Sequence, residues 1–459
     1  MEGSIDQCDL QLISGWAWNG ASAEEPAEIE ILDGDRVLAT LVADLYRPDL
    51  EAAKKGGGRC AFRWELPRKL LDDREHEIRV RFVGTNVEIG PAPRRLVWDT
   101  SARRELAAEM CGTMRALAWE ISGARIEDGR LEIQGWAIPP SDGRERTIRV
   151  NGVPFEKVEL ALRSKRIGGL YWYWPGAEHC AFECSIPMDA EDLFKGGPAV
   201  LEYVDSATGE PFDKGQIVYW PETVFEHGNV PPENNIRRTS GYSDAHLFLQ
   251  EGYTAYRRLA RQLTEMHGAW PSGRTLDWGS GCGRVLRWLL DAELPGVDVF
   301  GGDIDAANVR YCRQNLTGVE FEVLLLHPPT SYESGMFQVI YGLSVFTHLQ
   351  EDVQLAWLGE LARISAPGAT VLVTVHGDAS YCLAQPDSDW LKRIRETGFD
   401  ASIHDGILAG EIDDDAYYRA TFHTADYVRE RWSEYFEVVD ILEGFVCHQQ
   451  DLVVLRKRP

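Results

Sequence analysis

The sequence lacks the marks of several common protein classes. No apolar run approaches the roughly 18 residues that a membrane-spanning helix needs. The N-terminus, MEGSIDQCDL, has neither the basic n-region nor the apolar h-region of a secretory signal peptide. The nine cysteines include no CxxC pair, and no His-rich run has zinc-ligand spacing. We therefore expect a cytoplasmic protein with no membrane span and no metal site.

Positive charge is also scarce. The 47 lysine and arginine residues stand against 73 aspartate and glutamate residues, which gives a formal net charge of -26. Such a chain repels a phosphate backbone, so we expect no nucleic acid partner. With 44% hydrophobic and 26% charged residues, the composition is that of a globular protein. A length of 459 residues exceeds one hydrophobic core, and we expect three domains.

An internal repeat organises the first half of the chain. SGWAW at 14–18 recurs as QGWAI at 134–138, and RCAFRWELP from Arg59 recurs as HCAFECSIP from His179. Both matches have the same offset of 120 residues. Alternating apolar runs that end in turn dipeptides predict two similar all-β modules of the sandwich type, over residues 1–100 and 121–222. Residues 101–120 have a helix-forming composition and predict a linker helix.

The repeat also predicts which residues fill the two modules. Trp16 and Trp136, like Phe62 and Phe182, hold equivalent positions, where large apolar residues usually pack. The run YWYW at 171–174 has no counterpart in the first copy. Two interpretations stay open for it: an exposed aromatic face that stacks on sugar rings, or a surface that packs against another domain.

A glycine-rich motif marks the last domain, which we expect over residues 223–459. In this part strands and helices alternate, as they do in an α/β sheet. The motif D-x-G-x-G-x-G between a strand and a helix consists of Asp277, Gly279, Gly281 and Gly283. Its glycines permit a tight turn and a close approach of the backbone to a ligand. The dinucleotide fingerprint G-x-G-x-x-G would need glycine at position 284, where this chain has Arg284.

A second acidic residue has the spacing of a ribose ligand. Asp303 ends the predicted strand VDVFGGD and lies 20 residues after Gly283. A carboxylate at the tip of the second strand can accept hydrogen bonds from both ribose hydroxyls of an adenine nucleoside. Five strand-helix units are followed by two late strands, EYFEVVDIL and QQDLVVLRK. We therefore predict a seven-stranded sheet with an antiparallel last strand.

From about Thr239 onward, the chain resembles a class I S-adenosylmethionine-dependent methyltransferase with a Rossmann-like fold. The resemblance rests on LDWGSGCGRVLR, GGDIDAANVRYCRQN, YGLSVFTHL and APGATVLVTVHG, in this order. It implies S-adenosylmethionine as cofactor, held by Asp277, Gly279, Ser280, Gly281, Gly283, Asp303, Ile304, Ser344, Val345 and Phe346. Many relatives hold the adenine amino group with an acidic residue after the third strand. This chain has Leu326, His327 and Pro328 there, so the adenine contact is left to the backbone.

The methyl acceptor needs its own residues. The sulfonium methyl group is already activated, so catalysis needs in-line positioning, and a hydroxyl acceptor also needs a base to take its proton. We predict three candidate bases: His376 after the fifth strand, His348 after the fourth and His423 in YRATFHT. For each of them, the alternative is a histidine that is hydrogen-bonded to a neighbouring loop.

The N-terminal repeats resemble modules found beside glycosyltransferases and glycan-modifying enzymes. This resemblance implies O-methylation of a glycan or sugar intermediate. The alternatives are a lipid, protein or other small acceptor, or a non-catalytic binding or scaffold protein that has kept the methyltransferase fold. We expect the β modules to recruit the acceptor, or to contact a second copy or a partner in glycan biosynthesis.

Overall fold

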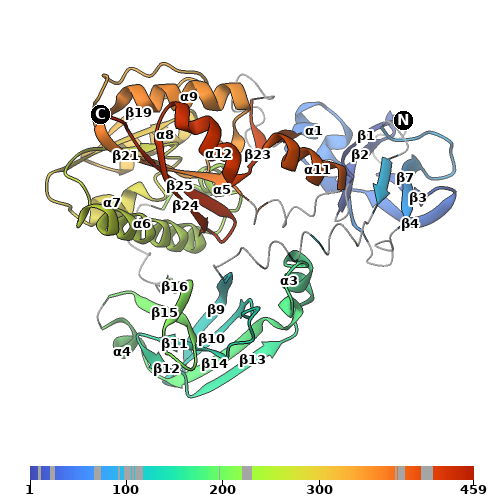
Figure 1. The fold of residues 1–459 in the computed structure, drawn as a ribbon. Coiled ribbons are helices and arrows are strands. Elements are labelled where there is room, and N and C mark those ends of the chain that lie inside the picture. Colours follow the sequence, from blue (N-terminus) through green and yellow to red (C-terminus); the bar gives the residue numbers. More distant parts are fainter. Residues whose placement is uncertain are drawn as a thin grey trace. The chain divides into compact units, whose positions relative to one another are not determined.

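A computed structural model describes most of the chain in two compact units. Residues not described are 9–11, 21–25, 67–73, 91–93, 98–104, 106–107, 109–116, 196, 220–229, 378–379, 381–387 and 405–416. The first unit combines Met1–Glu109 with Ala384–Glu396, and the second contains the remainder (Figure 1). The linker helix expected over 101–120 falls almost entirely outside the described residues. Among the helices that the structure describes, none is long and apolar enough to cross a membrane.

The first unit contains two four-stranded antiparallel sheets. The first sheet has the order β1 (Glu2–Cys8), β2 (Leu12–Trp18), β6 (Arg59–Glu65) and β5 (Leu45–Tyr46). The second has the order β4 (Arg36–Ala43), β3 (Ala27–Asp33), β7 (Glu75–Phe82) and β8 (Arg94–Val97). Both sheets contribute to one core, in which Ile13 and Phe62 of the first pack with Ile31 and Val80 of the second. The short helices are α1 (Pro48–Ala52), η2 (Gly56–Gly58) and α11 (Ser388–Thr397).

The second unit begins with a β module of the same design. One sheet has the order β13 (Lys157–Leu162), β14 (Ala181–Pro187), β10 (Arg130–Ala137) and β9 (Trp119–Glu127). The other has the order β12 (Val153–Pro154), β11 (Arg146–Val150), β15 (Ala199–Asp205) and β16 (Pro211–Tyr219). Gly135 pairs with Phe182 here as Gly15 pairs with Phe62 in the first unit. The sequence repeat is therefore also a repeat of strand register. The module's helices are α3 (Lys165–Leu170), η4 (Ala177–His179) and α4 (Ala190–Phe194).

The aromatic run at 171–174 is mostly buried. Tyr171, Tyr173 and Trp174 are each 5% exposed or less, and only Trp172 is half-buried. The ring of Tyr171 lies 5.6 Å from that of Trp136, and the indole of Trp174 donates to Pro139 O at 2.6 Å. The exposed sugar-stacking face is therefore wrong for these three residues, because they are buried inside their own module.

A nine-stranded sheet, rather than the expected seven strands, forms the rest of the second unit. Its main path is β19 (Glu320–Val323), β18 (Val297–Asp303), β17 (Gly273–Trp278), β20 (Phe337–Gly342), β21 (Ser365–His376), β23 (Arg419–His423) and β22 (Phe399–His404). The first five of these strands are parallel. β25 (Gln450–Arg456) also pairs with β21 and runs antiparallel to it, and β24 (Glu437–Val446) pairs with β25. The hairpin of β22 and β23 accounts for the two additional strands.

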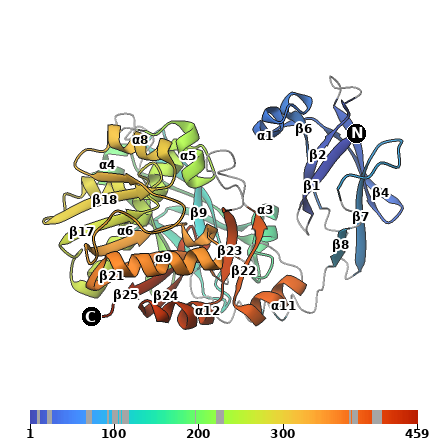
Figure 2. The same cartoon turned by 90° about the horizontal axis from the view of Figure 1, so that it is seen from above.

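The sheet is buried on both faces, because successive side chains of a strand point to opposite sides. Val371 and Val373 of β21 pack into one core and Leu372 into the other. The first core includes α9 (Glu351–Ile364) and α12 (Ala425–Arg431), and the second includes α6 (Ala245–His267), α7 (Leu286–Asp291) and α8 (Ala306–Asn315). Helices therefore flank the sheet on both sides (Figures 1 and 2). Three shorter helices are α5 (Glu233–Ser240), η6 (Phe346–His348) and η7 (Trp432–Glu434).

A glycine lets α6 approach the glycine-rich loop closely. A Cβ atom on Gly252 would overlap the carbonyl oxygen of Arg284, which is backbone and cannot rotate away. Gly359 in α9 offers a matched control, because a Cβ atom there would meet only ring carbons of Tyr435 at 3.6 Å or more.

We expect opposite effects from the two substitutions. Gly359→Ala should stabilise the protein by up to about 1 kcal/mol, through the higher helix propensity of alanine. Gly252→Ala should destabilise it by about 1 to 3 kcal/mol, since the helix must shift away from the loop. Urea denaturation of both variants measures the difference, and stabilisation by Gly252→Ala would contradict the close contact.

Candidate functional site

The glycine-rich loop follows β17 and turns sharply at the edge of the sheet. Gly279, Gly281 and Gly283 all have positive φ, at +80°, +52° and +79°. A side chain at Gly279 would overlap the methyl group of Val345, and a Cβ atom at Gly281 would lie 2.5 Å from Thr239 Cγ2. Both the conformation and the space therefore require glycine at these positions. At Gly279 and Gly281 the loop therefore borders the cavity with backbone atoms alone.

Asp303, at the end of β18, ties the second strand to this loop. One carboxylate oxygen accepts from Gly281 N at 2.7 Å and the other accepts from Asp305 N at 2.8 Å. A carboxylate has about four acceptor sites, so two remain for a ligand. The residue is therefore placed where a carboxylate can both hold the loop and accept ligand hydroxyls.

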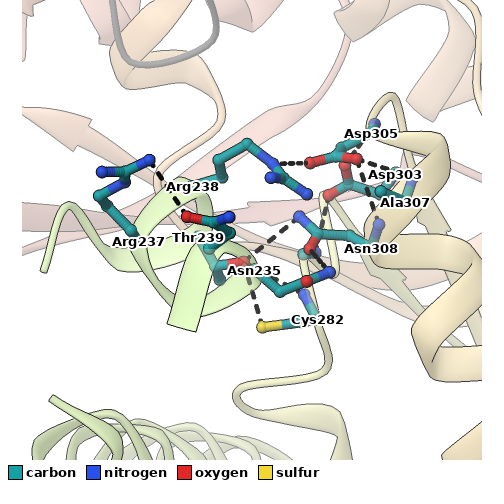
Figure 3. A network of polar contacts seen from close by, with 11 residues as sticks. Asn235, Arg237, Arg238, Thr239, Cys282, Asp303, Asp305, Ala307 and Asn308 are labelled. Carbon is teal, nitrogen blue, oxygen red and sulfur yellow. Dashed lines mark hydrogen bonds and ion pairs between the residues drawn. The ribbon is translucent and has the colours of Figure 1, made fainter. Parts of the chain in front are cut away.

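Helix α5 closes over the same corner through a polar network (Figure 3). Arg238 Nε donates to Asp305 Oδ2 at 2.6 Å, and both side chains are largely buried. Thr239 Oγ1 accepts from Cys282 N in the loop at 3.2 Å. Asn235 Nδ2 donates to Asn308 Oδ1 on α8 at 2.8 Å. No local sequence pattern predicts this network, since its partners are up to 73 residues apart.

Burial raises the pKa values of two carboxyl groups of the site. It raises the pKa of Asp277 to about 8, with a further contribution from the charge of Asp303, while Tyr341 and Arg284 oppose the shift. Burial likewise raises the pKa of Asp303 to about 6, against the two backbone N–H donors. A cationic ligand would favour the ionised forms, so binding of a cation at this site should release protons.

A cavity of about 500 Å³ opens beside the loop, within the range of small-ligand pockets. The sequence-predicted residues that line it are Asp277, Gly279, Ser280, Gly281, Asp303, Ile304, Ser344, Val345, His348 and His376. Lining residues that the sequence did not predict include Arg238, Tyr242, Glu251, Tyr418, Cys447 and Gln450. The hydroxyl of Ser280 is buried and has no hydrogen-bond partner among the described residues. The Ser280 hydroxyl is thus a polar group of the cavity wall to which a ligand can hydrogen-bond.

Three predicted residues lie outside the cavity lining. Gly283 shapes the loop from behind, where a Cβ atom would meet Leu316. Phe346 is fully buried, with its ring 4.9 Å from those of Trp278 and Trp432, so it belongs to the core.

His423 is also fully buried, and it is the third predicted residue outside the cavity. Its Nε2 lies 2.9 Å from Gln354 Oε1. Gln354 Nε2 donates to Phe346 O and Leu349 O, so its oxygen must accept and His423 Nε2 carries the hydrogen. Burial, with a smaller contribution from His376, lowers the pKa of His423 to about 3. The structure therefore does not bring His423 to the site where a base would act.

The other two histidines meet at the cavity. Their rings are 6.2 Å apart, and each Nδ1 faces a backbone carbonyl: His348 faces Arg419 O at 3.2 Å and His376 faces Thr421 O at 3.0 Å. A carbonyl can only accept a hydrogen bond, so Nδ1 carries the hydrogen in the neutral imidazole. Nε2 then carries the lone pair, which is the arrangement that a general base needs.

Ser344, in the loop after β20, is held in a strained conformation by residues of β21 and β25. Its φ is +61°, which is uncommon outside glycine. Its N–H donates to Thr374 Oγ1 at 2.7 Å, and its hydroxyl donates to Gln450 Oε1 at 3.0 Å. Non-glycine residues persist in such conformations where their surroundings fix them, often at functional sites.

Residues 324–328, directly after β19, include no carboxylate, and the carbonyl oxygen of Leu326 is occupied. Leu326 O accepts from the indole of Trp357 at 3.2 Å and from the hydroxyl of Tyr417. Leu324 lines the cavity instead. The backbone contact to adenine that the sequence suggested stays a prediction, and Leu326 O already has two donors.

Comparisons with known proteins address this part of the chain. Residues 275–368 match a family model described as "Methyltransferase domain". The match supports an enzyme that transfers methyl groups. Its cofactor is S-adenosylmethionine. A comparison with curated proteins found no match.

Solved structures that resemble the chain include three that cover about half of it. A Pyrococcus horikoshii protein is 19% identical over 44% of this chain and 89% of its own, with a TM-score of 0.32. The geranyl diphosphate C-methyltransferase of Streptomyces coelicolor is 12% identical over 44% and 80%, with a TM-score of 0.30. The 1,6-didemethyltoxoflavin-N1-methyltransferase of Burkholderia thailandensis is 14% identical over 57% and 97%, with a TM-score of 0.34.

The buried His423 should make stability depend on pH. Its pKa is near 6.5 in the unfolded chain and about 3 in the folded one, so the unfolded state binds the proton first as the pH falls. This group should cost about 2 to 3 kcal/mol of stability between pH 7.5 and pH 4.5. Urea denaturation of the wild type and of His423→Leu should show a smaller loss over this interval in the variant. Equal losses would mean that the imidazole is not buried as a neutral group.

Proposed function

We propose that residues 223–459 transfer a methyl group from S-adenosylmethionine to a hydroxyl group, and that the acceptor is a glycan or sugar intermediate. The observation that carries this proposal is the shared cavity. The glycine-rich loop and Asp303 lie on its wall together with His348 and His376. A cofactor site and a base for a hydroxyl proton thus occupy one space.

The cofactor fits the residues on the loop side. Gly279 and Gly281 line the cavity with backbone atoms, and the hydroxyl of Ser280 is buried with no hydrogen-bond partner among the described residues. We assign Asp303 to the ribose hydroxyls, because two acceptor sites of its carboxylate remain. Asp277 then faces the positively charged methionine part, where ionisation of its carboxyl group would stabilise the cation. When bound, the cofactor supplies an electrophilic methyl group.

His376 is the base that we propose for the acceptor proton. It ends β21, at the carboxyl edge of the parallel strands where ligands bind in such sheets. His348 stacks on Tyr418 at a ring distance of 4.1 Å, which restricts its movement and suits an orienting role. His423 is not proposed as a base, because it lies outside the cavity.

A sugar acceptor accords with the aromatic residues beside the imidazoles. Tyr417 and Tyr418 line the cavity, and aromatic rings pack against the apolar faces of sugar rings. The net charge of -26 disfavours a nucleic acid acceptor. Two alternatives give different results in the assay below. With a lipid, protein or other small acceptor, the label would enter that fraction. A non-catalytic scaffold protein would bind the cofactor without turnover.

Cofactor binding should depend on Asp303. Asp303→Ala removes the acceptor of the ribose hydroxyls and of Gly281 N–H, and we expect S-adenosylmethionine affinity to fall by about 1.5 to 3 kcal/mol. Isothermal titration calorimetry measures this loss. Asp298→Ala, an exposed position at the opposite end of β18, is the matched control and should bind as the wild type does. Wild-type affinity in Asp303→Ala would remove this residue from the site.

Turnover should depend on His376. We expect His376→Gln to lower kcat by a factor of about 10² to 10⁴, the usual contribution of a general base, with cofactor affinity little changed. The assay incubates the protein with isotope-labelled S-adenosylmethionine and fractionated cell extract, and follows label into carbohydrate, lipid and protein fractions. His348→Gln serves as comparison and should lose less. Full activity of His376→Gln would contradict its role, and label outside the carbohydrate fraction would contradict the acceptor class.

A further inference from the structure

The turn between β24 and β25 lies beside the proposed base. Val446 pairs with Gln450 across the turn, and Gln450 pairs with His376 in the register between β25 and β21. Cys447, Gln449 and Gln450 all line the cavity. The position of this turn therefore determines part of the cavity wall next to His376.

The side chain of Gln450 connects the turn to the neighbouring strands. Its Oε1 accepts from Thr374 Oγ1 at 2.8 Å and from Ser344 Oγ at 3.0 Å. Thr374 in turn accepts from the N–H of the strained Ser344. A displacement of the turn would consequently reach both β21 and the loop after β20.

The turn needs support because its backbone is strained. Cys447 and His448 have φ values of +49° and +55°, the pair of positive φ angles of a type I′ turn. Such turns favour asparagine and glycine, and each non-glycine residue in this region costs of order 1 to 3 kcal/mol. The surrounding structure must compensate for this cost.

The support comes from the second β module, which belongs to the same compact unit. The ammonium group of Lys214 in β16 donates to Glu443 O in β24. The indole of Trp119 donates to Lys214 O at 3.3 Å, and the Trp119 backbone is a hydrogen-bond partner of the His448 ring. The start of β9 and the middle of β16 are thus bonded to each other, and together they hold β24 and the turn that follows it.

Helix α6 makes a second connection between the module and the hairpin. Arg258 Nη1 donates to Phe445 O, two residues before the turn, at 2.5 Å. At the start of the same helix, His246 lies edge-on to Tyr219 of β16 with the rings 6.0 Å apart. The hairpin is thus held by the module both directly and through α6.

We propose that the second β module is a fixed part of the methyl-transfer site, and that Lys214 and Trp119 are positioning residues for the wall beside His376. This role goes beyond the recruitment of an acceptor that the sequence suggested. This proposal rests on the proposed function only in taking the cavity as the methyl-transfer site. Loss of the Lys214 contact should loosen the turn while the module and the sheet stay folded.

Cys447 reports the state of the turn. Solvent reaches this residue, but the surrounding protein and the nearby Glu251 carboxylate raise the pKa of its thiol to about 12. Release of the turn should bring the pKa down toward its ordinary value, and the thiolate fraction at pH 8 rises about tenfold for each pKa unit of that fall. The alkylation rate rises by less than the thiolate fraction, because a thiolate of lower pKa is a weaker nucleophile. The rate of alkylation by iodoacetamide at pH 8, followed by peptide mass spectrometry, measures the change and requires no methyl acceptor.

We expect Lys214→Met to raise the Cys447 alkylation rate at least tenfold, and Lys214→Arg, which keeps a donor, to stay within about threefold of the wild type. Lys157→Met, an exposed position of the same module, is the control. Cys8 in the first unit is an internal reference whose rate should not change in any variant. Trp119→Phe, which removes one donor only, should show a smaller increase. Wild-type rates in both Lys214→Met and Trp119→Phe would overturn the proposal, whatever the methylation assay shows.

Discussion

The hydrogen bond from Gly281 N–H to the Asp303 carboxylate is the contact on which the site depends. It joins the glycine-rich loop to the tip of β18, so that two strands present one wall to the cavity. Asp305 accepts from Arg238 next to it, which adds helix α5 to the same corner. Buried carboxylates are costly unless they are hydrogen-bonded. At Asp303, the backbone N–H groups of Gly281 and Asp305 offset this cost. The same two hydrogen bonds therefore shape the loop and hold a carboxylate at the cavity wall.

A second constraint acts on the two histidines that line the cavity. His348 and His376 each face a backbone carbonyl through Nδ1, and both carbonyls belong to β23. The additional hairpin of β22 and β23 thus selects the tautomer of both rings. This gives the two strands beyond the expected seven a chemical role, because they orient the groups that the proposed reaction uses.

Local sequence patterns predicted the features that are formed by residues close together in the chain. Glycine spacing around Gly281 and the position of Asp303 after a strand predicted two residues that meet at the cavity, and the repeat predicted two all-β modules, which share one register. Contacts between distant segments were beyond these patterns. The pairing of Arg238 with Asp305 spans 67 residues, and nothing in the spacing connects them.

Burial was the other property that the sequence did not reveal. Phe346 and His423 were both predicted at the site, yet each is fully buried and outside the cavity lining. His423 ends β23, where alternation along the strand decides which face a side chain takes and a shift of one position reverses the outcome. The aromatic run at 171–174 shows the same limit, since sequence alone does not tell a ring that covers its own module from one that faces solvent.

The first unit consists of two separate stretches of sequence, which limits how the protein can be divided into fragments. Residues 384–396 belong to the first unit although they follow β21 of the second. The polypeptide thus passes between the units three times, after Glu109, after Leu383 and after Glu396. After cleavage near residue 109, residues 384–396 would still connect the first unit to the second. A shortened gene that begins after the β modules would still encode α11 and would separate it from the rest of its unit. Clean excision of the first unit therefore requires removal of two stretches of sequence.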